Sequence, residues 1–257
     1  MAQFDSRYTQ ATTVGRAGVD EGLRAYMLGV YNYMAAGVAL TGIVAYLVFA
    51  MAVTNDPASA AATLPNGKML TSFGVAIFTT PLRWVLFLAP LAFVFFFAFK
   101  ANSMSVGAAQ TSFWIYAALV GASLSSILLV FTSTSIANVF FISAATFASL
   151  SIWGYTTKKD ISGWGSFLFM GLIGVIIASL VNIFMQSSAM QFAISVIGVL
   201  VFAGLTAYDT QRIKDVYYEV AGNAEAAAKA SIFGALSLYQ DFVGLFVNLL
   251  QLMGSRE

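Results

Sequence analysis

The chain has 257 residues, of which 60% are apolar and only 9% are charged, and its formal net charge is +1. A soluble globular domain carries roughly 25% charged residues, so this chain cannot cover an ordinary water-facing surface. It contains neither cysteine nor histidine, which excludes disulfides, thiolate nucleophiles, imidazole metal ligands and the Ser-His-Asp triad. The near-neutral charge leaves no basic surface for nucleic acid. We expect an integral membrane protein, without enzymatic activity or a bound cofactor.

Seven apolar runs approach the ~20 residues that a helix needs to cross ~30 Å of hydrocarbon. In chain order they cover residues 25–53, 82–99, 112–131, 138–156, 165–185, 191–209 and 231–253. Between and around them lie a polar cytoplasmic tail (1–24), a long external connection (54–80), a polar cytoplasmic connection (210–230) and a short C-terminal tail (254–257). The sequence therefore predicts an all-α transmembrane domain over residues 25–253 with seven transmembrane helices.

The distribution of charge predicts the orientation. No charged residue lies between Lys100 and Lys158, or between Asp160 and Asp209, and each interval has room for two spans, which return the chain to the side that it left. If the N-terminus lies on that side too, nine of the 12 Lys and Arg residues share it: Arg7, Arg16, Arg24, Lys100, Lys158, Lys159, Arg212, Lys214 and Lys229. The positive-inside rule makes this side cytoplasmic. We expect the N-terminus inside and the C-terminus outside.

Two acids are the leading candidates for function, because a charge inside a span is costly and rare. Asp241 lies near the middle of the last predicted span, and Asp209 ends the sixth. Asp241 alone could be a structural acid paired with a neighbouring helix, and Asp209 alone could be an interface residue paired with Arg212 or Lys214. Adjacent carboxylates in a dry site repel one another when both are ionised, so together they could respond to pH or bind a divalent cation.

Other polar side chains are weaker candidates. Lys100 ends the second span and could pair with either acid, although a lysine extending to the interface explains it as well. Candidate supporting groups near the two acids are Tyr208, Tyr239, Arg212 and Asn248. Hydrogen bonds between helices are a sufficient explanation for the uncharged polar residues inside spans, among them Asn182, Gln240 and Asn248.

Three stretches give the chain a family resemblance. AYMLGVYNYM (25–34), AYDTQRIK (207–214) and LSLYQDFVGLF (236–246) resemble segments of the transmembrane Bax inhibitor motif family, in its bacterial branch. The resemblance implies six helices around a central, rather polar C-terminal helix in an inner membrane. It also implies a pH-sensitive calcium leak, in which Asp209 and Asp241 form the carboxylate pair and weak calcium site, and Lys100 is the latch of the closed state.

Two points qualify this assignment. Gly244 stands where the family often has Asn, and the basic cluster that can follow the second span is reduced to Lys100. A pair also requires the sixth helix to continue past Tyr208, or the seventh to begin early, because simple counting places Asp241 deeper than Asp209.

A second hypothesis is a regulatory membrane protein that binds a membrane-anchored protease or another membrane complex. It would depend on residues 1–24 or 210–230 rather than on the acids. A third, an intramembrane aspartyl hydrolase, would require the combined YD…GxGD pattern, and the sequence contains no GxGD segment. For the leading hypothesis the partners are the lipid bilayer, calcium and protons.

Overall fold

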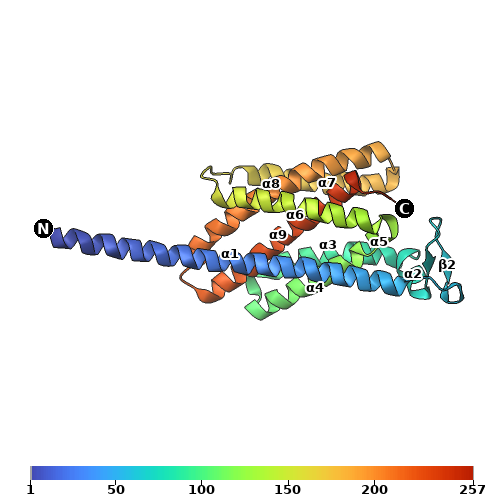
Figure 1. The fold of residues 1–257 in the computed structure, drawn as a ribbon, viewed down its shortest axis with the longest axis horizontal. Coiled ribbons are helices and arrows are strands. Elements are labelled where there is room, and N and C mark those ends of the chain that lie inside the picture. Colours follow the sequence, from blue (N-terminus) through green and yellow to red (C-terminus); the bar gives the residue numbers. More distant parts are fainter. Residues whose placement is uncertain (1, 257) are drawn as a thin grey trace.

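The structure, a computed structural model, describes residues 2–256 of the chain. It is built almost entirely of helices that run roughly along one axis (Figure 1). The long helices are α1 (Ala2–Ala52), α3 (Leu82–Lys100), α4 (Val106–Leu124), α6 (Ser133–Thr156), α7 (Trp164–Met185), α8 (Ser188–Val220) and α9 (Ala224–Met253). Short helical segments are α2 (Ser72–Phe78), α5 (Ile127–Val130) and the 3-10 turns η1 (Pro57–Ser59) and η2 (Ala101–Ser103).

Six of the helices in the described part of the chain are long and apolar enough to cross a membrane. They are α1 from Glu21 onward, α4 together with α5, α6, α7, α8 and α9. The predicted second span behaves differently: α2 and α3 meet these criteria only as a pair, which is bent by 60°. The all-α membrane architecture is thus confirmed, whereas the seventh crossing depends on this bent pair.

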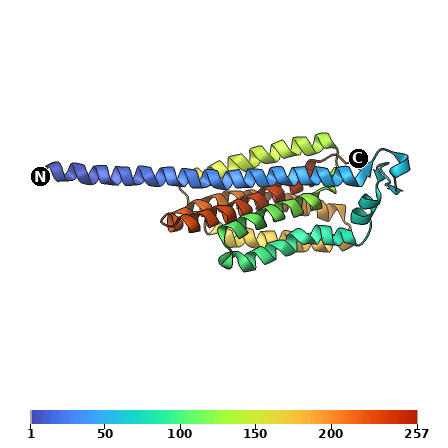
Figure 2. The ribbon, with the colours of Figure 1, turned by 90° about the horizontal axis from the view of Figure 1, so that it is seen from below.

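Helix α9 lies in the middle of the bundle, as the family resemblance implied. It packs against α1, α4, α6 and α8, and 61% of the residues in its most apolar 18-residue stretch are buried, against 11% for α7. Helix α7 packs mainly on α8, and α3 mainly on α4, so these two helices lie at the periphery of the bundle. Figures 1 and 2 show the two chain ends at opposite ends of the long axis, as an odd number of crossings requires.

The predicted external connection contains a small sheet that the sequence analysis missed. Strands β1 (Val53–Thr54), β2 (Ala62–Thr63) and β3 (Met69–Leu70) pair antiparallel in the order β1-β3-β2. Lys68 Nζ donates to the carbonyl of Leu128 at 2.9 Å, and Asn66 Nδ2 to that of Leu129 at 3.0 Å. These bonds attach the connection between β2 and β3 to α5. Strands of two residues have no readable alternation, so the pattern gave no signal.

The predicted basic residues of the α6–α7 connection and of the end of α8 lie at one end of the bundle. Gln211 on α8 accepts from the backbone N–H of Ile161 at 2.9 Å and donates to the carbonyl of Lys159 at 2.9 Å. Lys214 donates to the carbonyl of Tyr155 at 3.0 Å. The α6–α7 connection is therefore fastened to α8 beside Arg212, at the end where α8 turns into α9.

The two polar segments that we expected at this end are largely helical. Residues 2–20 continue α1 beyond the bundle as one helix (Figure 2), and the predicted connection 210–230 is reduced to residues 221–223 between α8 and α9. Asn223 begins α9 by accepting the N–H of Ala226 at 3.0 Å, a typical helix cap. Met1 and Glu257, the outermost residues of the two predicted tails, lie outside the described residues.

Candidate carboxylate site

The two predicted acids face a common space between the last two helices. Helix α8 continues unbroken to Val220, which satisfies the condition that a pair requires. Asp209 and Asp241 are only 9% and 3% exposed, and both line one cavity of about 920 Å³, here called the carboxylate cavity. The structure therefore brings together the residues that the family resemblance paired.

Asp241 is not held as a structural acid usually is. Its Oδ2 atom is buried and has no hydrogen-bond partner in the described part of the chain. Leaving a buried polar atom unsatisfied costs about 1–3 kcal/mol, and more when it is charged. Acids that serve packing are normally hydrogen-bonded, so this oxygen argues against the structural alternative and is available to an external donor or cation.

Arg212 is the basic group nearest to the pair. Its Nη1 lies 3.8 Å from Oδ1 of Asp209, and its side chain is 63% exposed. Such an exposed ion pair contributes at most about 1 kcal/mol. The ionisable side chains that line the carboxylate cavity are Tyr116 from α4, Tyr208, Asp209 and Arg212 from α8, and Asp241 from α9, while α3 and α7 contribute none.

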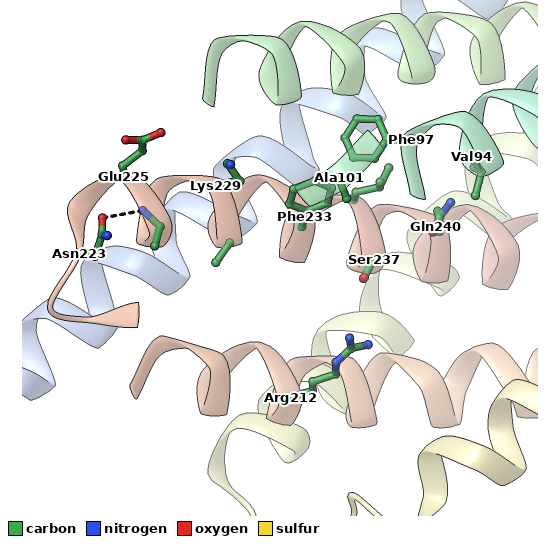
Figure 3. A pocket seen from close by; sticks show the side chains of 13 residues that line it. Val94, Phe97, Ala101, Arg212, Asn223, Glu225, Lys229, Phe233, Ser237 and Gln240 are labelled. Carbon is green, nitrogen blue, oxygen red and sulfur yellow. Dashed lines mark hydrogen bonds between the residues drawn. The ribbon is translucent and has the colours of Figure 1, made fainter. Parts of the chain in front are cut away.

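A second cavity connects the pair to the end where α8 turns into α9. This entry cavity, of about 780 Å³, is lined at that end by Asn223, Glu225 and Lys229. It shares four lining residues with the carboxylate cavity: Val94, Arg212, Ser237 and Gln240. Figure 3 shows Arg212 projecting from α8 toward Ser237 on α9. The two cavities thus adjoin, and Arg212 stands at their junction.

The remaining predicted site residues lie elsewhere. Tyr239 is fully buried on another side of α9, where its hydroxyl is 2.6 Å from that of Thr41. Asn248 donates to the carbonyl of Gly244 at 2.8 Å, two turns from Asp241. Lys100 is exposed and lines neither cavity. Tyr208 does line the carboxylate cavity, so of the supporting candidates only Tyr208 and Arg212 join the two acids.

Sequence reasoning missed several polar groups around the pair. Gln240 donates to the hydroxyl of Tyr116 on α4 at 3.2 Å, which confirms the expected hydrogen bond between helices but also places the amide in the cavity wall. On the other face of α8, the Ser151 hydroxyl lies 2.6 Å from that of Tyr31 and 2.9 Å from that of Thr210. Thr210, next to Asp209, was the sequence signal for a polar cluster here. Its partners Ser151 and Tyr31 are distant in sequence, so the sequence could not identify them.

The donor set suits transient cation contact better than storage. Calcium takes 6–8 oxygen ligands in stable protein sites. Among the described residues no group of three or more acids, histidines or cysteines could hold a metal ion. Two carboxylates and the hydroxyl and amide oxygens of Ser237 and Gln240 would leave most of the coordination shell to water.

Fold and site together define a class: an all-α integral membrane protein whose central C-terminal helix carries one acid of a buried carboxylate pair. Residues 23–257 match the family described as "Inhibitor of apoptosis-promoting Bax1". The chain belongs to this Bax inhibitor family, as its sequence motifs suggested.

Similar proteins occur in diverse bacteria. The chain is 44% identical over 254 residues to the uncharacterized protein RP147 of Rickettsia prowazekii, covering 99% of each chain. It is 43% identical to an uncharacterized protein of Caulobacter vibrioides over 100% of both chains. It is 40% identical to the inner membrane protein YbhL of Escherichia coli, over 92% of this chain and 94% of the relative.

Proposed function

We propose that this protein is a pH-regulated, calcium-permeable leak channel of a bacterial inner membrane. The observation that carries the proposal is the pair Asp209 and Asp241, buried among membrane-spanning helices yet adjoining a cavity that extends to the α8–α9 turn. A charge in a span is expensive unless water or a counter-ion reaches it. The cavity gives the acids that access, and the name of the Escherichia coli relative supports the location.

The pH response follows from competition for the same oxygens. When both acids are ionised they repel one another, and a proton or a divalent cation relieves that repulsion. A fall in pH therefore displaces calcium from the pair, and a rise in pH favours calcium. Weak binding by few protein ligands suits passage, because a permeating ion must leave as readily as it enters.

Calcium flux into liposomes that contain the purified protein, measured from acidic to neutral pH, tests the proposal. We expect a pH-dependent flux in the wild type. Asp241→Asn should abolish most of the flux or its pH response, and Asp209→Asn should flatten the response. The double variant should add little to either single one, because the two acids act as a unit.

Asp160 provides a matched control outside the spans. Ser162 hydrogen-bonds to its carboxylate through both side chain and backbone and lowers its pKa below the usual value. Asp160 is therefore already ionised at neutral pH, and Asp160→Asn should leave the pH profile unchanged. If both dyad variants keep the wild-type flux and pH profile, the carboxylate pair is not the site of regulation and the proposal fails.

We also infer that the N-terminus is cytoplasmic, because nine basic residues lie on the side of the α8–α9 turn. A reporter fused after Glu257 should then read as periplasmic. A cytoplasmic reading would mean that the bent pair α2 and α3 does not cross the membrane.

A regulatory role through a membrane partner is the second candidate. It is favoured by the helical extension of α1, whose residues 2–20 project beyond the bundle (Figure 2) and could reach another complex. Deletion of residues 2–20 separates the two functions: it should leave calcium flux in liposomes unchanged if the acids carry the activity. A cellular phenotype that is lost on this deletion but survives Asp241→Asn would favour the partner.

A further inference from the structure

The carboxylate cavity has a counterpart at the far end of the same two helices. An outer pocket of about 440 Å³ lies where α7 ends, α8 begins and α9 ends. Its polar lining includes Asn182, Gln191, Gln251 and Arg256. The α8–α9 interface thus runs from the carboxylate pair at one end to a polar pocket at the other.

Polar and glycine residues mark this interface along both helices at helical spacing. On α9, Asp241, Gly244, Asn248 and Gln251 follow one another at steps of three, four and three residues, which keeps them on one face. On α8 the corresponding stripe is Gln191, Ser195, Gly198, Phe202 and Asp209. The α8 stripe also carries Leu205 between Phe202 and Asp209, and both Phe202 and Leu205 line the carboxylate cavity.

The polar members of the stripes do not serve to bind the two helices together. Asn248 donates to the carbonyl of Gly244 at 2.8 Å, within α9, and Gln191 donates to the hydroxyl of Ser195 at 3.3 Å, within α8. Polar side chains in membrane helices commonly hydrogen-bond across to a neighbour. Gln191 also accepts from Nδ2 of Asn182 on α7 at 3.1 Å, so none of these three bonds joins α8 to α9.

Phe202 closes this path by contact with Gly244. A β-carbon placed on Gly244 would collide with the ring atoms Cε1 and Cζ of Phe202 and lie 2.6 Å from Cδ1, whereas ordinary contact begins at 3.4 Å. The ring thus occupies the space that a side chain at position 244 would fill. Both residues line the carboxylate cavity, so the ring packed on Gly244 forms part of the cavity wall between α8 and α9.

We propose that the ion path runs along the α8–α9 stripes, and that the ring of Phe202, seated on Gly244, is its gate. The inference rests on the proposed channel function and names its route. Hydrophobic constrictions close pores by excluding water. A rotation of the ring, or a slight separation of α8 from α9, would join the carboxylate cavity to Asn248 and the outer pocket.

Because the chain has no cysteine, single introduced thiols can report water access without any measurement of calcium. Ser237→Cys should react with a membrane-impermeant thiol reagent added at the α8–α9 turn side, and Gln251→Cys with the reagent added at the other side. Asn248→Cys should be protected from the turn side. Adding Phe202→Ala should raise the labelling of Asn248→Cys from that side by at least about tenfold.

The matched control is Phe167→Ala, because Phe167 on α7 is 73% exposed and lies away from the stripes. It should leave labelling unchanged. Phe202→Leu, which keeps most of the volume, should give an intermediate rate, and Gly244→Ala, which displaces the ring, should raise the rate without removing Phe202. These two variants replace Phe202→Ala if that protein does not fold.

Labelling and flux separate the two proposals. Unchanged labelling of Asn248→Cys in all Phe202 and Gly244 variants overturns the gate. Increased labelling with no calcium flux supports the gate and contradicts the calcium channel. Calcium flux with unchanged labelling supports a channel that follows another route.

Discussion

In the half of the α8–α9 interface near the connecting turn, Asp209, Arg212, Ser237 and Gln240 line cavities, whereas in the other half glycines bring the helices into direct contact. Both halves belong to the same two continuous helices, so the difference comes from side-chain size and not from backbone breaks. Polar residues next to a cavity can be hydrated. Glycines opposite Phe202 and Asn248 remove the space that hydration needs.

The largest effect is expected in the half of the α8–α9 interface where the helices touch, here called the sealed half. The half that lines the cavities is called the hollow half. A β-carbon on Gly198 would lie 2.9 Å from Nδ2 of Asn248, so Gly198→Leu forces the helices apart. Overpacking of this kind costs about 1–3 kcal/mol, and the melting temperature in detergent should fall accordingly. Ser237→Leu, in the hollow half, should cost much less because its side chain faces a cavity.

Two other glycines serve as controls for the general effect of replacing a glycine within a helix. A β-carbon on Gly42 or Gly174 meets nothing within 4 Å, so alanine there should be neutral or slightly stabilising. If Gly198→Leu melts like Gly174→Leu, the two halves of the interface are equally loose and the comparison fails.

A smaller effect is expected when the hydrogen bonds on the other face of α8, behind the hollow half, are weakened. Ser151→Ala removes the hydroxyl between Tyr31 and Thr210. Loss of a buried hydrogen-bonded group costs about 1 kcal/mol, which should appear as a modest shift in thermal unfolding. Ser149→Ala is the control on the same helix, since the Ser149 hydroxyl bonds to the carbonyl of Ala145 on an exposed face. Equal shifts in the two variants would mean that the Tyr31–Ser151–Thr210 contacts add nothing.

The smallest effect concerns the cation at the junction of the two cavities. Arg212→Gln removes the positive charge 3.8 Å from Asp209, so calcium should compete better for the pair. For an exposed ion pair worth up to about 1 kcal/mol, the gain in calcium flux or affinity should not exceed roughly fivefold. Lys214→Gln is the control, because Lys214 is bound to Tyr155.

The same assay decides between Arg212 and the predicted latch. Lys100→Ala should raise the leak at a pH where the wild type is mostly closed, if Lys100 fulfils the role that the resemblance gives it. A response to Arg212→Gln but not to Lys100→Ala would move the latch to α8. The opposite result would keep it after α3.

The sequence predicted those features that depend on composition and local spacing. The lengths of the apolar runs located the spans. Because each long interval without charge has room for two spans, the sequence also placed Lys158, Arg212 and Lys214 at one end. The ends of α8 and α9 were misplaced, because residues 210–230 are polar enough to resemble a connection yet continue the helices into water. Hydropathy detects burial in lipid, not where a helix stops.

The pairing of Asp209 with Asp241 was predictable through the family motifs, whereas the contacts that shape its cavity were not. Phe202 lies seven residues from Asp209, and its contact with Gly244 arises from helix packing over more than 40 intervening residues. Glycine at 244 could be recognised as a departure from the family pattern. The physical reason for it, a ring in the same space, required the structure.

The seal at Phe202 has a consequence for the membrane's electric field. A hydrated cavity conducts, so little of the transmembrane voltage falls along it, and most of the voltage falls across the short sealed segment between the carboxylate pair and the outer pocket. Moving one elementary charge through the full field involves about 2.3 kcal/mol per 100 mV, and a divalent cation twice that. Protons reaching Asp209 from the turn side would thus be nearly insensitive to voltage, while passage of calcium past Phe202 would depend on it steeply.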